Sequence, residues 1–208
     1  MKQILSRVWM ISVVVVMSGT LALAQQRPIG SSSDTTPTNP ATSNPDINGT
    51  QQVQQTQNSA EGAMIDKAFV ESALRSRMAE VELGKLAAQK GSSPDVKQFG
   101  QKMVADHSKL GDQMQQVAQQ MGVHDPKGLS KKDKKLVAKL ETLSGSQFDD
   151  AYIEAMVKDH KDDLSNFRAE ANDTQNSTLR QVAQQDEQVI DGHLQIIEQI
   201  AKAHDVKS

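Results

Sequence analysis

Two histidines stand in matching segments of the chain, and imidazole is a common metal ligand near neutral pH. His107 lies in the segment Phe99–Leu110, and His160 lies in the segment Tyr152–Leu164. Both segments read aromatic-x3-Met-Val-x-Asp-His, and the second histidine follows the first by 53 positions. A histidine repeated on the apolar face of two helices indicates a buried site that contains both imidazoles.

Two further residues could complete a metal site with these histidines. Each histidine lies 13 residues after the expected start of its helix, so the two would sit at one height if the helices run parallel. His193 lies midway along a later helical segment, and Glu80 lies on the inward face of an earlier one. Three imidazoles and a carboxylate could bind zinc, iron or copper.

A structural polar layer is the alternative interpretation of the same residues. A buried histidine is often satisfied by a carboxylate from a neighbouring helix. Four aspartates lie close enough in the pattern to do this, namely Asp106, Asp159, Asp163 and Asp186. A ferritin-type dinuclear iron centre is not expected, because that centre uses Glu-x-x-His motifs and this sequence contains none.

The elements that must position these residues are helices. Apolar residues recur at steps of three and four over 66–90, 94–121, 147–171 and 178–203. Ser93 and Pro94 are typical of a helix N-terminus, and Gly122 is typical of a C-terminus. The long connection between the second and third of these helices includes a short helix over 131–143.

These helices predict an all-α fold, a ferritin-like four-helix bundle. The tight turn at 91–94 makes the first two helices antiparallel neighbours, and the turn at 172–177 does the same for the last two. The middle connection, which contains the short helix, is long enough to cross the length of the bundle. Such a crossover would make the two helices with the repeated histidines parallel.

The N-terminal region predicts export. Residues 1–24 have a basic start, an apolar run and the small-x-small ending Ala22-Leu23-Ala24, which is typical of a cleaved signal peptide. A retained membrane anchor is the alternative. Residues 25–62 are polar and rich in proline, and they predict a disordered tether. The bundle domain is expected at 63–205, in the periplasm or cell envelope.

Composition excludes several functional classes. A net charge of −3 gives no support for nucleic-acid binding. The chain has no cysteine, so thiol catalysis and cysteine-bound zinc are excluded. Hydrolase and P-loop signatures are absent, and the mature chain contains no expected membrane span. A protein partner or a homo-oligomer remains open.

Two segments of the chain also resemble a known protein family. They are VELGKLAAQKGSSPDVKQFGQKMVADHSK and FDDAYIEAMVKDHKDDL. Over 66–203 the chain resembles an exported bacterial family of unknown function, the domain of unknown function 4142, whose members are often labelled outer membrane proteins. The resemblance implies a ferritin-like bundle and an envelope location, and it implies no established reaction. The label itself is not supported here by alternating strands or by a lipid-attachment cysteine.

Two hypotheses for function follow. The first is a non-enzymatic envelope protein that acts in stress tolerance or as an interaction module. The second is a metal-binding protein that uses His107, His160, His193 and Glu80 for sequestration or redox protection. Metal analysis of the purified protein separates the two hypotheses.

Overall fold

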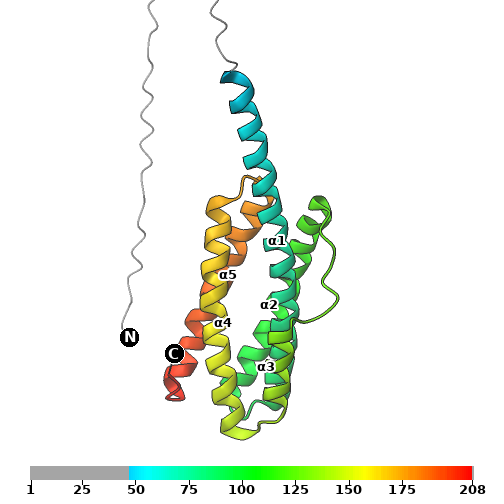
Figure 1. The fold of residues 1–208 in the computed structure, drawn as a ribbon. Coiled ribbons are helices and arrows are strands. Elements are labelled where there is room, and N and C mark those ends of the chain that lie inside the picture. Colours follow the sequence, from blue (N-terminus) through cyan, green and yellow to red (C-terminus); the bar gives the residue numbers. More distant parts are fainter. Residues whose placement is uncertain (1–46, 208) are drawn as a thin grey trace, which may run out of the picture. The chain divides into compact units, whose positions relative to one another are not determined.

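A computed structural model describes the backbone of residues 47–207 and the side chains of residues 56–207. The predicted export signal at 1–24 and residues 25–46 of the predicted tether lie outside the described residues. Within this region the helices are α1 (Ile47–Lys90), α2 (Pro94–Met121), α3 (Lys131–Glu141), α4 (Gly145–Asp173) and α5 (Ser177–Ala203) (Figure 1). No strand occurs between residues 47 and 207, which confirms the predicted all-α class.

The four long helices form the bundle, and α3 belongs to the connection between α2 and α4 (Figure 1). Helices α2 and α4 begin at the same end, because the Asp149 carboxylate near the start of α4 accepts hydrogen bonds from the backbone N–H groups of Ser92 and Ser93. Both bonds are 2.8 Å long. The connection therefore returns along the bundle, and α2 and α4 are parallel, as in ferritin-like folds.

The same contact changes one expectation about the start of α2. Ser93 occupies the N-cap position with extended backbone, as predicted, and Pro94 is the first helical residue. The Ser93 hydroxyl makes no capping hydrogen bond, however. The turn is held instead by Asp149, a tertiary partner that local sequence patterns do not reveal.

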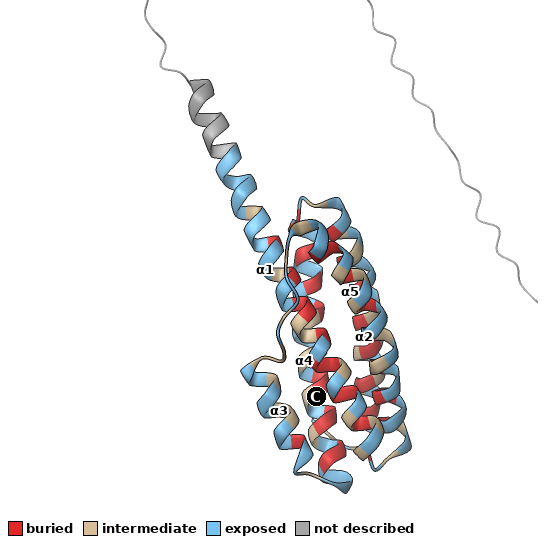
Figure 2. Cartoon of the chain, turned by 90° about the vertical axis from the view of Figure 1, so that its right-hand side faces the viewer, coloured by how far each residue is buried: buried red, intermediate tan, exposed pale blue. Residues whose placement is uncertain are grey.

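Helix α1 begins at Ile47, well before the predicted start at Asp66. The polar composition of residues 47–62 predicts an unstructured segment, but this segment contains no proline, and its glutamine and alanine favour helix. Side chains 56–61 and 63–65 are exposed, so this part of α1 extends past the bundle and packs on little of it (Figure 2). Burial begins at Asp66, where the apolar period also begins.

The core consists of two apolar clusters with a polar layer between them. One cluster, near the start of α2, includes Leu83, Phe99, Met103, Phe148 and Tyr152. The other includes Val70, Met114, Phe167, Leu179 and Ile190. The buried polar residues between them come from all four long helices and include Arg77, Glu80, His107, His160, Asp186 and His193. Within the described region, no helix combines the length and apolarity that crossing a membrane requires.

Two glycines bring α1 and α2 into close contact next to this layer. A Cβ atom added at Gly100 would lie 2.7 Å from the Gly84 carbonyl oxygen and 2.8 Å from the backbone nitrogen of Ala88. A Cβ atom at Gly84 would lie 2.8 Å from the Gly100 carbonyl oxygen. Because backbone atoms make these contacts, a side chain at either position would push the helices apart. The glycine pair thus sets the distance between the helices that carry Glu80 and His107.

We expect Gly100→Ala to lower the free energy of unfolding by about 1–3 kcal/mol, the usual range for overpacking a core. Alanine favours a helix over glycine by about 1 kcal/mol, so the strain must exceed that gain. The matched control is Gly192→Ala in α5, where a new Cβ atom would meet nothing within 4 Å. Urea denaturation should show Gly192→Ala stabilised by about 0.5–1 kcal/mol. Equal stabilisation of both variants would contradict the tight α1–α2 contact.

Candidate metal centre

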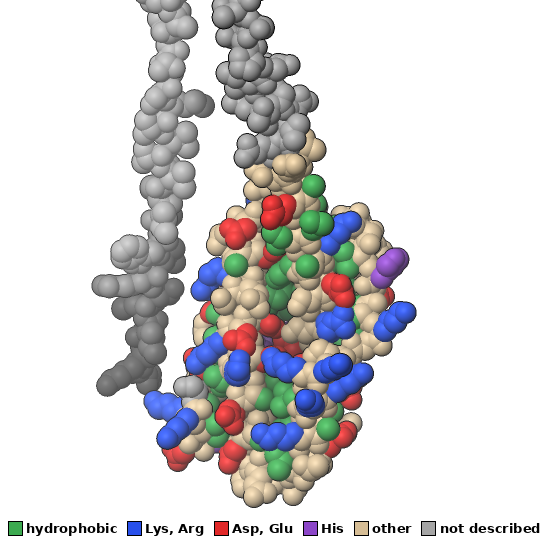
Figure 3. All heavy atoms as spheres, viewed as in Figure 1, with side chains coloured by type: hydrophobic (Ala, Val, Ile, Leu, Met, Phe, Trp, Pro, Cys, Tyr) green, Lys and Arg blue, Asp and Glu red, His purple; other side chains and the backbone are tan. Residues whose placement is uncertain are grey.

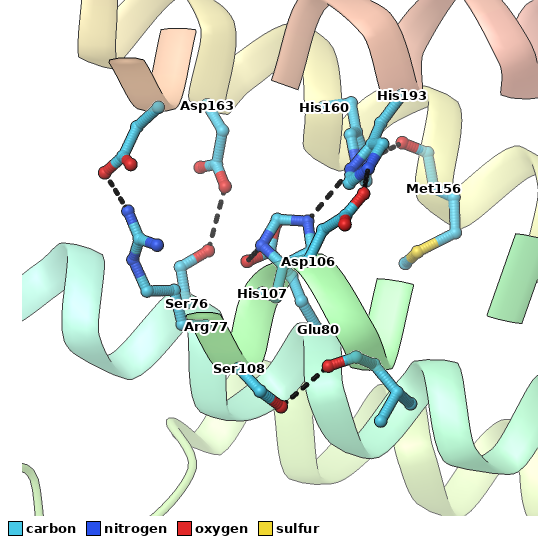
Figure 4. A network of polar contacts seen from close by, with 12 residues as sticks. Ser76, Arg77, Glu80, Asp106, His107, Ser108, Met156, His160, Asp163 and His193 are labelled. Atoms are coloured by element: carbon cyan, nitrogen blue, oxygen red, sulfur yellow. Dashed lines mark hydrogen bonds and ion pairs between the residues drawn. The ribbon is translucent and has the colours of Figure 1, made fainter. Parts of the chain in front are cut away.

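Three imidazoles from three helices meet in the polar layer. His107 comes from α2, His160 from α4 and His193 from α5, and Figure 4 shows the rings gathered at one point. The ring centroids are 5.0–5.9 Å apart, and each histidine places one nitrogen within 4.8 Å of a nitrogen of the other two. Their exposed fractions are only 2%, 0% and 1%. The structure therefore brings His107, His160 and His193 together at one height in the bundle, as predicted.

In each ring, one nitrogen faces an oxygen atom outside the imidazole cluster. His160 Nδ1 lies 2.9 Å from the Met156 carbonyl oxygen and donates to it, one helical turn away in α4. His193 Nε2 lies 2.8 Å from Asp106 Oδ2, and His107 Nδ1 lies 2.8 Å from Glu80 Oε2. Oxygen partners of this kind orient metal-binding histidines and fix their tautomers. The remaining nitrogens, His107 Nε2, His160 Nε2 and His193 Nδ1, are the candidate ligands.

These remaining nitrogens are poorly satisfied by the protein alone. His160 Nε2 is buried and has no hydrogen-bond partner among the described residues. His107 Nε2 and His193 Nδ1 lie 3.1 Å apart, so one of them must carry a proton for the contact to be favourable. His107 Nδ1 is close to Glu80 but lacks hydrogen-bond geometry, and no described side chain or backbone group forms a hydrogen bond with Glu80 Oε1. A cation among the three nitrogens would satisfy all of their lone pairs together.

Burial keeps the imidazoles neutral at pH 7. Loss of solvation, assisted by the nearby Arg77 guanidinium, lowers the pKa of His107 to about 3. Burial also lowers the pKa of His160 and His193 to about 4, although Asp106 partly opposes this at His193. Neutral imidazole is the form that binds a metal, because the lone pair is free.

The Asp106 carboxylate remains charged although it is partly buried. Burial alone would raise the pKa of Asp106, but hydrogen bonds from Lys102 and His193 bring it below its ordinary value. A charged Asp106 keeps the proton of His193 on Nε2, which leaves Nδ1 as an acceptor facing His107. Asp106 therefore influences the site through its hydrogen bond with His193.

Two other predicted aspartates form a second group with Glu80. Oxygen atoms of Glu80, Asp159 and Asp163 lie within 4.8 Å of one another. Ser76 Oγ donates a 3.0 Å hydrogen bond to Asp163 Oδ2. Burial, together with the Glu80 and Asp159 carboxylates, raises the pKa of Asp163 to about 8, and burial raises the pKa of Glu80. Asp159 and Asp163 were expected to support histidines, but they lie beside Glu80 instead, and Glu80 is the member of the group that contacts His107.

The fourth predicted aspartate, Asp186, has a different partner. It forms a buried ion pair with Arg77, which comes from α1. Burial raises the pKa of Asp186 to about 6, and the Arg77 guanidinium opposes this rise. The only sequence signal for this pair was that Arg77 and Asp186 each lie on the apolar face of their own helix. Spacing within one helix could not show that the two would meet.

Grooves on the surface reach the centre from two sides. One groove, of about 610 Å³, lies between α2 and α5 and is lined by residues that include Asp106 and His193. Another, of about 410 Å³, lies between α1 and α2 and reaches Arg77 and His107.

Comparison with solved structures supports the same fold. A DUF305 fragment from Deinococcus radiodurans matches with a TM-score of 0.59 and 14% identity, over 66% of this chain and 95% of that chain. A DUF305 protein from Streptomyces coelicolor, whose description as secreted is provisional, matches with a TM-score of 0.58 and 13% identity. This match covers 69% of this chain and 95% of that chain. At this identity the likeness shows the fold alone, a ferritin-like helical domain.

Comparison with curated proteins finds no significant match. The family model described as "Domain of unknown function (DUF4142)" matches residues 51–200, which include all of α2 and α4, most of α1 and α5, and the three buried histidines. This match covers more than half of the 208 residues and agrees with the resemblance of the repeated Met-Val-x-Asp-His segments. The chain therefore belongs to the DUF4142 family.

Proposed function

We propose that this protein binds a first-row transition-metal ion through His107 Nε2, His160 Nε2 and His193 Nδ1. The observation that carries the proposal is the His160 ring: its Nδ1 donates to the Met156 carbonyl, and its buried Nε2 has no hydrogen-bond partner among residues 56–207. One nitrogen from each of the other two imidazoles lies within 4.8 Å of one on this ring. This is the arrangement of a three-histidine metal site with oriented ligands.

A purely structural polar layer accounts for these contacts less well. A layer of that kind is stable when each buried donor and acceptor is paired. A proton on Glu80 could complete a chain from Glu80 through His107 and His193 to Asp106, but it would leave His160 Nε2 unpaired. One metal ion would accept the lone pair of His160 Nε2 together with a lone pair from each of the other two rings.

The ligand types favour zinc, copper or iron over magnesium or calcium, because imidazole nitrogen suits these transition metals. Glu80, 1% exposed and 2.8 Å from His107, supplies a carboxylate next to the imidazoles. The rings are nearly inaccessible to solvent, and a closed site of this kind suits holding an ion more than turning over a substrate. We infer a non-enzymatic role in metal sequestration.

The compartment we propose for this role is the periplasm or the cell envelope. Residues 1–24 have the pattern of an export signal, and the structurally similar DUF305 protein from Streptomyces coelicolor is provisionally described as secreted. A metal-binding bundle in that compartment would protect the cell by lowering the free concentration of a redox-active or toxic ion. This is a specific form of the stress-tolerance hypothesis.

Metal analysis of the protein purified without a tag tests the proposal. We expect one tightly held zinc or copper ion per chain after dialysis, and loss of that ion in His160→Asn. Asparagine can still donate a hydrogen bond toward the Met156 carbonyl but lacks an atom in the place of Nε2. The His107→Ala, His160→Ala double variant should lose the ion as well.

The matched control is His124→Asn, because His124 lies exposed in the loop after α2. It should retain the full metal content, and circular dichroism should show every variant folded. Folded wild-type protein that holds no zinc, copper or iron after incubation with each would rule out the proposal. Equal loss of metal in His124→Asn would show that the ion binds elsewhere.

A further inference from the structure

A group of three carboxylates lies beside the imidazole cluster, and two of them, Asp159 and Asp163, have no role in the proposed imidazole site. Glu80 comes from α1, and Asp159 and Asp163 come from neighbouring turns of α4. One oxygen atom from each lies within 4.8 Å of the others. Glu80 belongs to both groups, since its Oε2 lies 2.8 Å from His107 Nδ1.

Three carboxylates at this separation favour a positive charge among them. Glu80 is buried and the two aspartates are partly buried, so like charges at close range repel strongly and a proton or a cation is favoured among them. Lys132 Nζ reaches only the outer side of the group, 3.4 Å from Asp159 Oδ1, and its side chain is 68% exposed. Ser76 donates one hydrogen bond to Asp163, which is a neutral contact. Among the residues that the structure describes, no lysine or arginine forms an ion pair with Glu80 or Asp163.

A second observation points to a bound ligand. Glu80 is 1% exposed, and its Oε1 atom has no hydrogen-bond partner in the described part of the chain. A carboxylate oxygen so deeply buried is costly when it accepts no hydrogen bond. Its group faces Asp159 and Asp163, where a cation would be bound by oxygen atoms from all three residues.

We propose that Glu80, Asp159 and Asp163 bind a second divalent cation, of the class that prefers oxygen ligands, and that Glu80 bridges it to the imidazole-bound ion through its contact with His107 Nδ1. Bonds of about 2.1–2.6 Å to such a cation allow ligand oxygens up to about 5 Å apart, which the observed separations satisfy. Carboxylates suit manganese, magnesium and calcium. The inference rests on the proposed function only in the bridging role of Glu80.

A route for the cation is present between α1 and α4. A groove of about 480 Å³ is lined by Ser76 and Asp163 at one end and by Glu170 and Asp173 further along α4. Figure 3 shows acidic side chains in the middle of the face that carries α1 and α4. Burial and the Asp66 carboxylate raise the pKa of Glu170 to about 7, which fits a run of close acidic groups. This groove is separate from the two that reach the imidazoles.

Titration of metal-free full-length protein with Mn²⁺, followed by electron paramagnetic resonance, tests the inference. We expect one Mn²⁺ per chain in the wild type and loss of that binding in Asp159→Asn, Asp163→Asn. The double variant should still bind one zinc ion at the imidazoles, which also shows that it is folded. His160→Asn should give the reverse result, with Mn²⁺ retained and zinc lost.

The matched control is Asp162→Asn, an exposed carboxylate in the same turn of α4 that pairs with Lys158. It should bind both ions as the wild type does. Zinc binding without Mn²⁺ binding in the wild type, or Mn²⁺ binding that survives the double substitution, would overturn the second site alone. Mn²⁺ binding without zinc binding would overturn the proposed function and leave the carboxylate site standing.

Discussion

Replacing Arg77 with methionine is expected to lower the free energy of unfolding by about 3–5 kcal/mol, the cost of breaking a buried ion pair from one side. The side chains of Arg77 and Asp186 are 5% and 0% exposed, and they bind each other in the interior of the bundle. Without the guanidinium, Asp186 would keep a buried charge with no partner or take up a proton. Urea or guanidinium denaturation at pH 7 measures the loss.

The double variant Arg77→Met, Asp186→Leu is the informative control. Removing both charged groups replaces the pair with apolar side chains of similar size, which is often nearly neutral. We expect it to recover most of the stability that Arg77→Met loses. Arg168→Met, at the exposed pair with Glu187, should cost less than about 1 kcal/mol. A loss no larger at Arg77 than at Arg168 would contradict the buried pair.

The metal-free protein should be stabilised by Asp163→Asn, and increasingly so as the pH rises from 4 to 8. In the folded state Ser76 and Glu80 from α1 and Asp159 from α4 face Asp163, whose pKa burial raises to about 8. The ordinary value is 3.8, so between these values the folded state binds a proton that the unfolded state has lost. The wild type therefore loses stability across this window, by up to about 1.4 kcal/mol per pH unit.

Asparagine has no proton to release, so the variant lacks this loss. Denaturation in the presence of a chelator at pH 5, 6, 7 and 8 gives the difference directly, and it should level off above pH 8. Asp162→Asn serves again as the control and should show no such trend, because its carboxylate is exposed. A stability difference that does not change with pH would contradict a buried, protonated Asp163.

Much of the fold could be predicted from the helical periodicity of apolar residues and from the residues that begin and end helices. The bounds of α2, α4 and α5 follow the apolar stripes and the breaks at Gly122 and near Ser177 closely. The start of α1 could not be found this way, because an exposed helix has no apolar face to reveal it. The Asp149 contact with the α1–α2 turn was also hidden, since it joins segments far apart in the chain.

The candidate site was predicted at the level of residues and not of atoms. The equal spacing of His107 and His160 from their helix starts predicted one layer, because helical rise per residue is constant. Periodicity fixes the face of a helix but not the side-chain rotamer. It therefore could not show that His160 binds the Met156 carbonyl or that Asp159 and Asp163 turn toward Glu80. These contacts depend on packing between helices.

The central claim is that three imidazole nitrogens share one ion in the bundle core. X-ray absorption spectroscopy of the zinc-loaded protein tests it most directly, because imidazole ligands give a distinct scattering pattern. We expect three imidazole nitrogens at about 2.0–2.1 Å from the zinc, with one oxygen ligand completing the site. A zinc shell made only of oxygen ligands, or a spectrum that is the same in His160→Asn, would contradict the claim.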